Sequence, residues 1–232
     1  MQAGRKLAFA VSIALTLAAV RPACAAGDLN STLKKLDAAA ARFHTASADF
    51  EFDTVETEPV LDTEVQKGVV YYQRSGSNFQ MGVHINLVNG QPVPKVVVCC
   101  QGGVIKLYEK LIDQVTTLSK FSQYKSYFML GFGASGKDLE EKWNIQDDGP
   151  EMLNGVKTEK LEMVPKDPAI RKNLPKVTVW MDLDTGVNLK QVFDEGQGQY
   201  RTCTYTNIRV NRSLPGDAFT FNTDRLTTYV NQ

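Results

Sequence analysis

The chain has 232 residues, of which 43% are hydrophobic, and it carries 26 basic and 26 acidic side chains. This balance of charge argues against nucleic acid as a partner. A chain of this length buries one sizeable core and contains no linker-like stretch, so the sequence predicts a single domain after its N-terminal segment.

Residues 1–25 have the pattern of a cleaved secretory signal peptide. Arg5 and Lys6 precede an apolar run of about 14 residues, and small residues follow up to a cleavage site after residue 25 or 26. The apolar run is too short to span about 30 Å of hydrocarbon. We therefore expect residues 26–232 to form one exported, periplasmic domain with 23 basic and 26 acidic side chains.

Residues 28–44 are predicted to form the one long helix. Their apolar side chains recur at spacings of four and three residues, which places them on one helical face; they are Leu29, Leu33, Leu36, Ala40 and Phe43. Asp28, Asn30 and Ser31 are candidates for the N-cap. A lone amphipathic helix in a β-rich chain is expected to lie across a sheet.

Residues 47–55 are predicted to form the first strand, because apolar and acidic side chains alternate along them. Phe50 and Phe52 fall on one face, and Asp49, Glu51 and Asp53 fall on the other. Such a strand has one dry and one wet face.

The next predicted unit is a hairpin formed by residues 67–74 and 79–81. Its first strand is rich in β-branched and aromatic residues, and a glycine-containing turn over residues 75–78 follows. Arg74 stands at the hinge, where its guanidinium has five donors suited to backbone carbonyls or carboxylates. The alternative is an exposed turn arginine that only keeps the hairpin soluble.

Further short runs with strand-like alternation follow at regular intervals, separated by glycine-containing turns. They are residues 96–100, 104–108, 143–148, 157–165, 176–182, 188–194, 199–210 and, as the last candidate, 219–221. Together with the first strands, they predict about ten or eleven antiparallel strands, as in a meander, sandwich or barrel.

The middle of the chain breaks this rhythm. Residues 120–130 carry aromatic side chains near helical spacing, and a glycine-rich segment, residues 131–136, follows. We expect one or two short helices here, serving either as a lid over an apolar cavity or as an ordinary crossover. The glycine-rich segment lacks the lysine of a phosphate-binding loop.

The sequence offers no catalytic or metal-binding constellation. There is no Gly-x-Ser-x-Gly element, the two histidines stand alone, and no Cys-x-x-Cys occurs. We therefore expect no enzymatic activity, no metal and no cofactor.

The cysteines leave two alternatives open. Cys99 or Cys100 can bridge to Cys203 in an oxidising compartment, with the other thiol buried. Cys24 allows lipid attachment, although Arg21 occupies the place where a lipoprotein signal carries an aliphatic residue.

The order of these segments resembles the periplasmic carriers of outer-membrane lipoproteins of the LolA type. The resemblance is carried by the first helix, by residues 43–50, 68–79 and 98–108, by the step at Gln114, and by residues 214–221. It implies a mostly antiparallel α+β fold, a half-open β-barrel of about ten or eleven strands covered by the N-terminal helix and short lid helices. The barrel encloses an apolar cavity that receives lipoprotein acyl chains.

By this resemblance, Arg74 holds the lid closed through hydrogen bonds, and Phe79 and Met81 line the cavity. The full set of candidate ligand-binding residues is Arg74, Phe79, Met81, Phe50, Phe52, Tyr72 and Leu107. The sequence departs from the family at Ser75, which replaces a proline, and at the turn over residues 100–103.

The resemblance implies a monomeric carrier that shuttles acylated lipoprotein or lipid from the inner to the outer membrane. Its partners would be an inner-membrane releasing complex and an outer-membrane acceptor. An envelope sensor domain of the same fold, which binds lipid and contacts a signalling protein, is the alternative. A secreted hydrolase is a third hypothesis.

Overall fold

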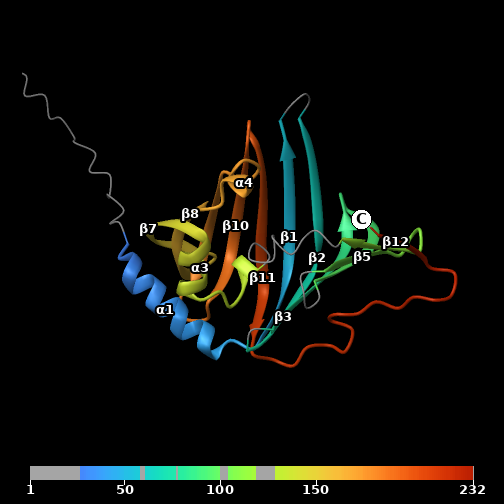
Figure 1. Ribbon diagram of the computed structural model, residues 1–232, viewed down its shortest axis with the longest axis horizontal. Coiled ribbons are helices and arrows are strands. Elements are labelled where there is room, and N and C mark those ends of the chain that lie inside the picture. Colours follow the sequence, from blue (N-terminus) through green and yellow to red (C-terminus); the bar gives the residue numbers. More distant parts are fainter. Residues whose placement is uncertain (1–26, 58–60, 77, 100–103, 119–128, 232) are drawn as a thin grey trace, which may run out of the picture.

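The computed structural model describes residues 27–57, 61–76, 78–99, 104–118 and 129–231 (Figure 1). The expected signal peptide with Cys24, the residue Cys100 and residues 120–128 of the predicted lid lie outside this part of the chain. No helix among the described residues has both the length and the apolar character needed to cross a bilayer.

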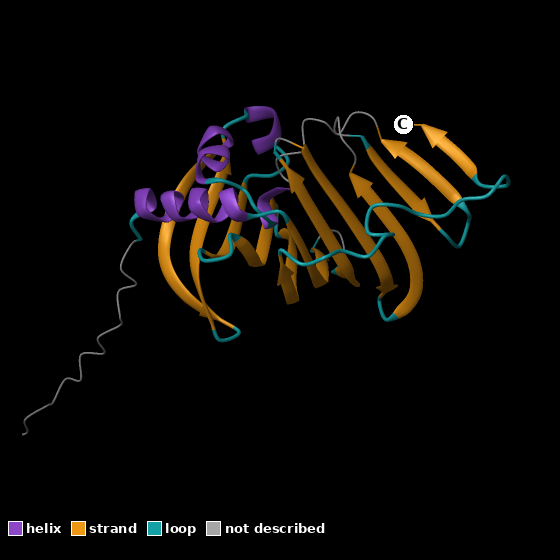
Figure 2. Ribbon diagram, turned by 90° about the horizontal axis from the view of Figure 1, so that it is seen from below, coloured by secondary structure: helices purple, strands orange, loops and turns teal. Residues whose placement is uncertain are grey.

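The described strands form one twelve-stranded sheet in the order β12-β6-β5-β4-β3-β2-β1-β11-β10-β9-β8-β7. In chain order they are β1 (Thr45–Glu56), β2 (Asp62–Ser75), β3 (Asn78–Val88), β4 (Gln91–Cys99), β5 (Ile105–Glu109), β6 (Gln114–Leu118), β7 (Trp143–Leu153), β8 (Val156–Pro165), β9 (Lys176–Asp182), β10 (Val187–Gly196), β11 (Gln199–Val210) and β12 (Thr228–Asn231). All neighbouring pairs are antiparallel except β12 with β6. Figure 2 shows the sheet as a curved, open layer.

The predicted mostly antiparallel fold is therefore confirmed, with one more strand than the upper expectation of eleven. The predicted strand over residues 219–221 is wrong, because these residues lie in turn and irregular backbone. Phe221 stacks instead on Tyr108 of β5, with 5.1 Å between ring centroids. Its aromatic pattern thus reflects packing of a loop onto a strand, and the last strand of the sheet is β12.

The helix α1 (Leu29–Arg42) begins at Asp28, whose carboxylate accepts a hydrogen bond from the Ser31 amide at 3.4 Å. Its buried face includes Leu33, Leu36 and Ala40, as the spacing predicts. The Thr32 hydroxyl also donates to the buried Asp147 carboxylate of β7 at 2.8 Å, which fixes the helix on this end of the sheet.

Three short elements complete the fold, namely η3 (Met129–Gly131), α3 (Gly136–Lys142) and α4 (Pro168–Arg171). Figure 2 shows the helices gathered over one end of the curved sheet. Here Leu36 of α1, Leu139 of α3 and Trp143 of β7 pack with apolar side chains of β8 and β9 into one core cluster. A second cluster around Phe50, Tyr72 and further aromatic residues occupies the centre of the sheet.

Candidate ligand pocket

A pocket of about 570 Å³ lies against the central strands of the sheet. Most of its lining side chains are apolar and come from β1, β2, β3, β10 and β11, with further contributions from β4 and from the connection between β8 and β9. They are Phe50, Phe52, Gln66, Val70, Tyr72, Met81, Val83, Ile85, Val97, Ile170, Asn173, Leu174, Gln191, Phe193, Glu195, Arg201, Cys203 and Tyr205. This volume is within the range of small-molecule sites, about 300–1,000 Å³.

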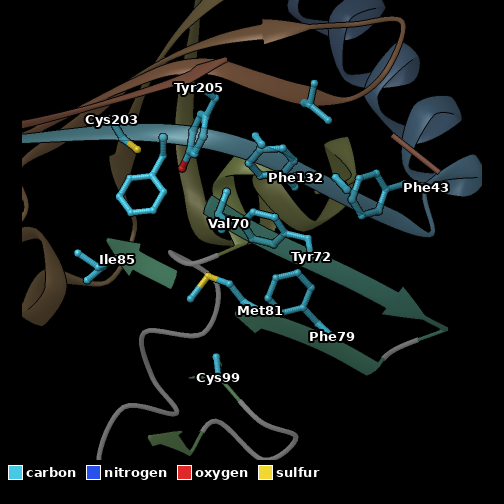
Figure 3. Packing of buried hydrophobic residues seen from close by; sticks show 14 of the residues in the cluster. Phe43, Val70, Tyr72, Phe79, Met81, Ile85, Cys99, Phe132, Cys203 and Tyr205 are labelled. Carbon is cyan, nitrogen blue, oxygen red and sulfur yellow. The ribbon is translucent and has the colours of Figure 1, made fainter. Parts of the chain in front are cut away.

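The strand register explains why these side chains meet. In the pairing of β1 with β11, Phe50 lies opposite Tyr205 and Phe52 lies opposite Cys203. Because alternate residues of a strand point to one face, these four side chains share the pocket side of the sheet. Figure 3 shows Cys203 and Tyr205 facing Val70 and other side chains from β2 and β3.

One end of the pocket is closed by aromatic packing. Phe132, which is 1% exposed, stacks on Tyr72 at 4.2 Å between centroids and meets Tyr205 edge-on at 5.1 Å. The Gln191 amide donates to the Tyr205 hydroxyl at 3.3 Å. The polar groups at this end are therefore satisfied by one another, which is the condition for burying them.

The buried polar groups of the pocket are held in their neutral forms. Burial raises the pKa of the Cys203 thiol to about 12. Burial also raises the pKa values of Tyr72 and Tyr205 above their ordinary value. Desolvation disfavours the charged form of each group, so the pocket wall presents no buried charge at neutral pH.

The other end of the pocket is polar. Arg201 of β11 forms an ion pair with Glu195 of β10 at 3.1 Å, and the two side chains are 46% and 24% exposed. Gln66 of β2 also borders this end. Ile170 and Leu174 enter the lining from the β8–β9 connection, which contains α4.

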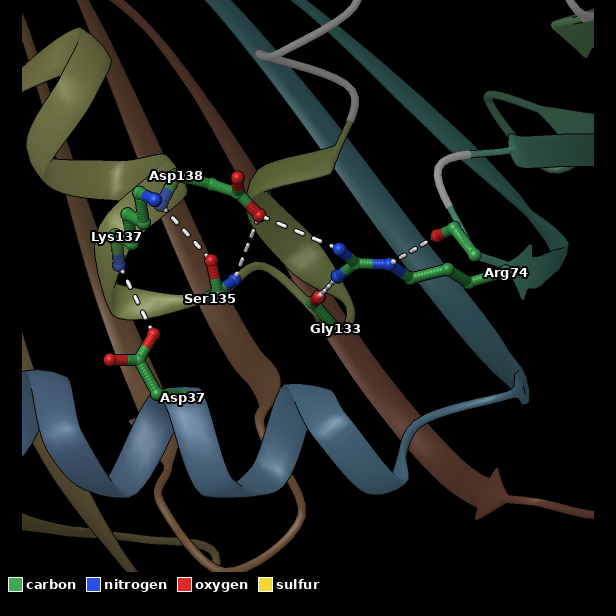
Figure 4. A network of polar contacts seen from close by, with 7 residues as sticks. Asp37, Arg74, Gly133, Ser135, Lys137 and Asp138 are labelled. Carbon is green, nitrogen blue, oxygen red and sulfur yellow. Dashed lines mark hydrogen bonds and ion pairs between the residues drawn. The ribbon is translucent and has the colours of Figure 1, made fainter.

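Arg74 lies at the end of β2 toward the aromatic closure and is not a lining residue of the pocket. Its Nη1 donates to the Gly133 carbonyl at 2.5 Å and its Nε donates to the Gly76 carbonyl at 3.3 Å. Its Nη2 lies 3.7 Å from the Asp138 carboxylate of α3. Figure 4 shows this guanidinium joining the hairpin turn to the segment that carries Phe132.

The segment around Gly133 is further fixed on its other side. Ser135 and Asp138 form a capping box at the start of α3, and the Lys137 amide donates to Asp37 of α1 at 3.2 Å. Gly133 has a φ of +69°, and a Cβ there would lie 2.4 Å from the Phe43 ring. This position therefore requires glycine.

Seven candidate ligand-binding residues were predicted from the sequence, and the structure places four of them at the pocket and three away from it. Phe50, Phe52, Tyr72 and Met81 border the pocket, whereas Phe79, Arg74 and Leu107 do not. Phe79 is 1% exposed and packs against Tyr72, with 5.7 Å between the two ring centroids.

Sequence reasoning missed the contributions of β10, β11 and α4. The alternation of Arg201, Cys203 and Tyr205 with polar residues in β11 was the available signal, because it predicts one shared face. Cys203 carries a free, buried thiol, so the disulfide considered for it is absent. Among the described residues, no group of three or more histidine, cysteine or acidic side chains is placed to hold a metal.

No family model matches this sequence, and no curated protein sequence matches it either. Solved structures with a similar fold include MucB, with a TM-score of 0.51 and 14% identity over 84% of this chain. The chain spans 63% of that structure's length. The complex of MucA and MucB from Pseudomonas aeruginosa is similar with a TM-score of 0.49 and 16% identity; 84% of this chain and 62% of the matched chain are covered.

A LolA superfamily protein from Nitrosomonas europaea is also similar, with a TM-score of 0.40 and 15% identity; 84% of this chain and 98% of that one are covered. At such identities, similarity concerns the fold alone. The open antiparallel sheet with α1 across one end, together with the likeness to MucB, confirms the LolA-like fold that the sequence predicted.

Proposed function

We propose that this protein is a periplasmic carrier that holds acyl chains of a lipoprotein or lipid in the pocket between β1, β2, β3, β10 and β11. The observation that carries the proposal is the mostly apolar lining of a pocket of about 570 Å³ whose charged side chains, Glu195 and Arg201, lie at one end. Each methylene buried there contributes about 0.8 kcal/mol. A long acyl chain is therefore the ligand that such a wall favours most.

The segment that carries Phe132 is the closing element in this proposal. It fills the aromatic end of the pocket and is held by Arg74 through the Gly133 carbonyl. Release of that hydrogen bond would free Phe132 to withdraw from Tyr72 and lengthen the pocket. The proposal assigns no catalytic group, and the partners are an inner-membrane donor and an outer-membrane acceptor.

A lipid-sensing domain in envelope regulation is the second candidate. It is favoured by the fold likeness to MucB, a protein whose structure is also known in complex with MucA. In this alternative the pocket has the same ligand class, but the bound state changes contact with a protein partner instead of delivering cargo. Co-purification of a stoichiometric protein partner with lipid-loaded chain, and absence of transfer between two membranes, would favour it.

The test of the proposed function is binding of a fluorescent fatty-acid probe to the exported protein, together with mass spectrometry of its organic extract. Phe52 and Leu107 are both half-buried strand residues, and Phe52 alone borders the pocket. Phe52→Glu should weaken probe binding at least tenfold, because it places a carboxylate in an apolar wall. Leu107→Glu is the matched control and should bind normally.

Both variants must unfold at comparable temperatures for this comparison to hold. Equal binding by the Phe52→Glu and Leu107→Glu proteins would contradict the pocket as the site. An extract without lipid, combined with no binding of any acyl probe, would contradict the proposed function itself.

A further inference from the structure

The volume of the pocket limits how much acyl chain it holds, if it binds acyl chains as proposed above. A methylene group is about as large as a water molecule, for which the share of liquid volume is about 30 Å³. The pocket of about 570 Å³ thus matches the size of one chain of roughly 16 to 18 carbons. A ligand with two or three such chains would need space beyond this volume.

The strands also give the pocket a direction. Along β11 the lining side chains are Tyr205, Cys203 and then Arg201, which span about 14 Å at roughly 3.4 Å per residue. On β10, Gln191 lies opposite Cys203 in the ladder, and Glu195 lies farther toward the polar end. The polar character of the wall therefore rises from the aromatic closure toward Arg201.

The two ends differ in what they offer a ligand's polar group. At the closed end, the Tyr205 hydroxyl and the Gln191 amide already bond each other, and Phe132 fills the space beside them. At the other end, Arg201 is 46% exposed and retains guanidinium donors beyond the one paired with Glu195. A half-exposed ion pair of this kind is weak, so Arg201 can exchange it for another anion.

Additional positive charge borders the same end. Arg171 and Lys172 are exposed and lie between Ile170 and Asn173, two lining residues of the β8–β9 connection. Asp167, the nearest acidic residue of this connection, is engaged as the N-cap of α4 through the Ala169 amide at 2.8 Å. Carboxylates lie at this end as well, since Glu195 pairs with Arg201 and Glu64 accepts a hydrogen bond from the Gln66 amide at 2.6 Å. The preference for an anionic head group therefore rests on the donors of Arg201 and not on the net charge of this end.

We infer that the ligand is a single-chain anionic amphiphile, whose chain lies along β11 and whose carboxylate or phosphate contacts Arg201. A fatty acid and a lysophospholipid share this chemistry. The inference depends on the proposed acyl-binding function. It adds the number of acyl chains, the charge of the head group and the residue that binds the head group.

The experiment is titration calorimetry of the delipidated exported protein with four ligands that carry the same 16-carbon chain. These are palmitate, lysophosphatidylglycerol, the neutral monoacylglycerol and two-chain phosphatidylglycerol presented below its aggregation threshold in cyclodextrin. We expect one molecule of an anionic single-chain ligand per protein chain, bound at least tenfold more tightly than the neutral and the two-chain ligands. Preference for palmitate or for lysophosphatidylglycerol identifies the head group.

Arg201→Gln tests the assigned residue, and Arg209→Gln, an exposed arginine elsewhere on β11, is its matched control. Arg201→Gln should weaken anionic ligands at least tenfold and leave the neutral ligand unchanged, because only the charge-assisted bonds are lost. Arg209→Gln should change neither. An unchanged thermal midpoint confirms that both variants are folded.

The outcomes separate this inference from the proposed function. Equal or tighter binding of the two-chain or the neutral ligand would overturn the single-chain anionic assignment and leave the carrier proposal standing. Equal loss of anionic and neutral binding in the Arg201→Gln protein would overturn the role of Arg201. Failure of all four ligands to bind would overturn the acyl-binding function itself.

Discussion

Replacement of Arg74 by leucine tests whether the guanidinium holds the Phe132 segment in place. The lost charge-assisted hydrogen bond to the Gly133 carbonyl is worth about 1.5–3 kcal/mol. The Arg74–Asp138 ion pair has an N–O distance of 3.7 Å, and the Asp138 side chain is 50% exposed. It adds about 0–1 kcal/mol. The total loss of about 1.5–4 kcal/mol corresponds to a roughly 12- to 700-fold rise in local opening, since 1.4 kcal/mol is a factor of ten.

Amide hydrogen exchange measures this opening directly. The Gly133 amide donates to the Gly186 carbonyl at 3.1 Å, so its exchange should accelerate by the same factor in the Arg74→Leu protein. Amides in β9 exchange through global unfolding and should accelerate by no more than this factor, from a much slower starting rate, because the change destabilises the closed state against every more open one. Arg74→Lys should restore protection only in part, since lysine lacks the planar fork.

Arg42 provides the control for this experiment. Its guanidinium also donates to a backbone carbonyl, that of Asp184, but at 3.4 Å and in an exposed position. Arg42→Leu should therefore change the exchange of Gly133 by less than about threefold, because such a bond is worth little. A folded Arg74→Leu protein in which Gly133 exchanges at the wild-type rate would refute the reasoning.

Three further changes have defined outcomes. Phe132→Ala should lower the free energy of unfolding by about 3–5 kcal/mol in urea denaturation, and a loss below about 1 kcal/mol would contradict the tight packing on Tyr72. Burial, followed by a hydrogen bond with Asp147, raises the pKa of Glu159 from 4.5 to about 7. Its protonated form thus favours folding, and its contribution is present below pH 4.5 and lost as pH rises through about 7. Glu159→Gln should flatten the fall in thermal midpoint between pH 5 and pH 8, and an unchanged profile would disprove the assignment. Cys203, with a pKa of about 12, should react with iodoacetamide at pH 8 only after denaturation, whereas rapid labelling of the folded protein would show an accessible thiolate.

The segment that carries Phe132 and the β8–β9 connection lie at different ends of the pocket. The sequence predicted either a lid or an ordinary crossover in the middle of the chain, and the described part of that segment carries Phe132 into the aromatic end. The polar end is bordered instead by Ile170 and Leu174 of the β8–β9 connection. Ligand entry in the proposed carrier is therefore expected at the polar end, with Arg74 controlling the opposite one.

Local patterns alone determined most elements of this protein. The spacing of Leu33, Leu36 and Ala40 fixed the buried face of α1, and alternation in β1 placed Phe50 and Phe52 on one side. The hairpin at Arg74 also followed from local residues, because strand preference and turn glycine act over a few positions.

Only the tertiary structure decided which faces meet across the pocket. Phe52 lies opposite Cys203, about 150 residues away in the chain, through the β1–β11 pairing. Period-two alternation gives each strand two faces but does not say which strand is its neighbour. Long-range strand pairing and chain reversal therefore bring Arg201 and Ile170 of α4 to the pocket. Phe79 does not border the pocket and packs against Tyr72 instead.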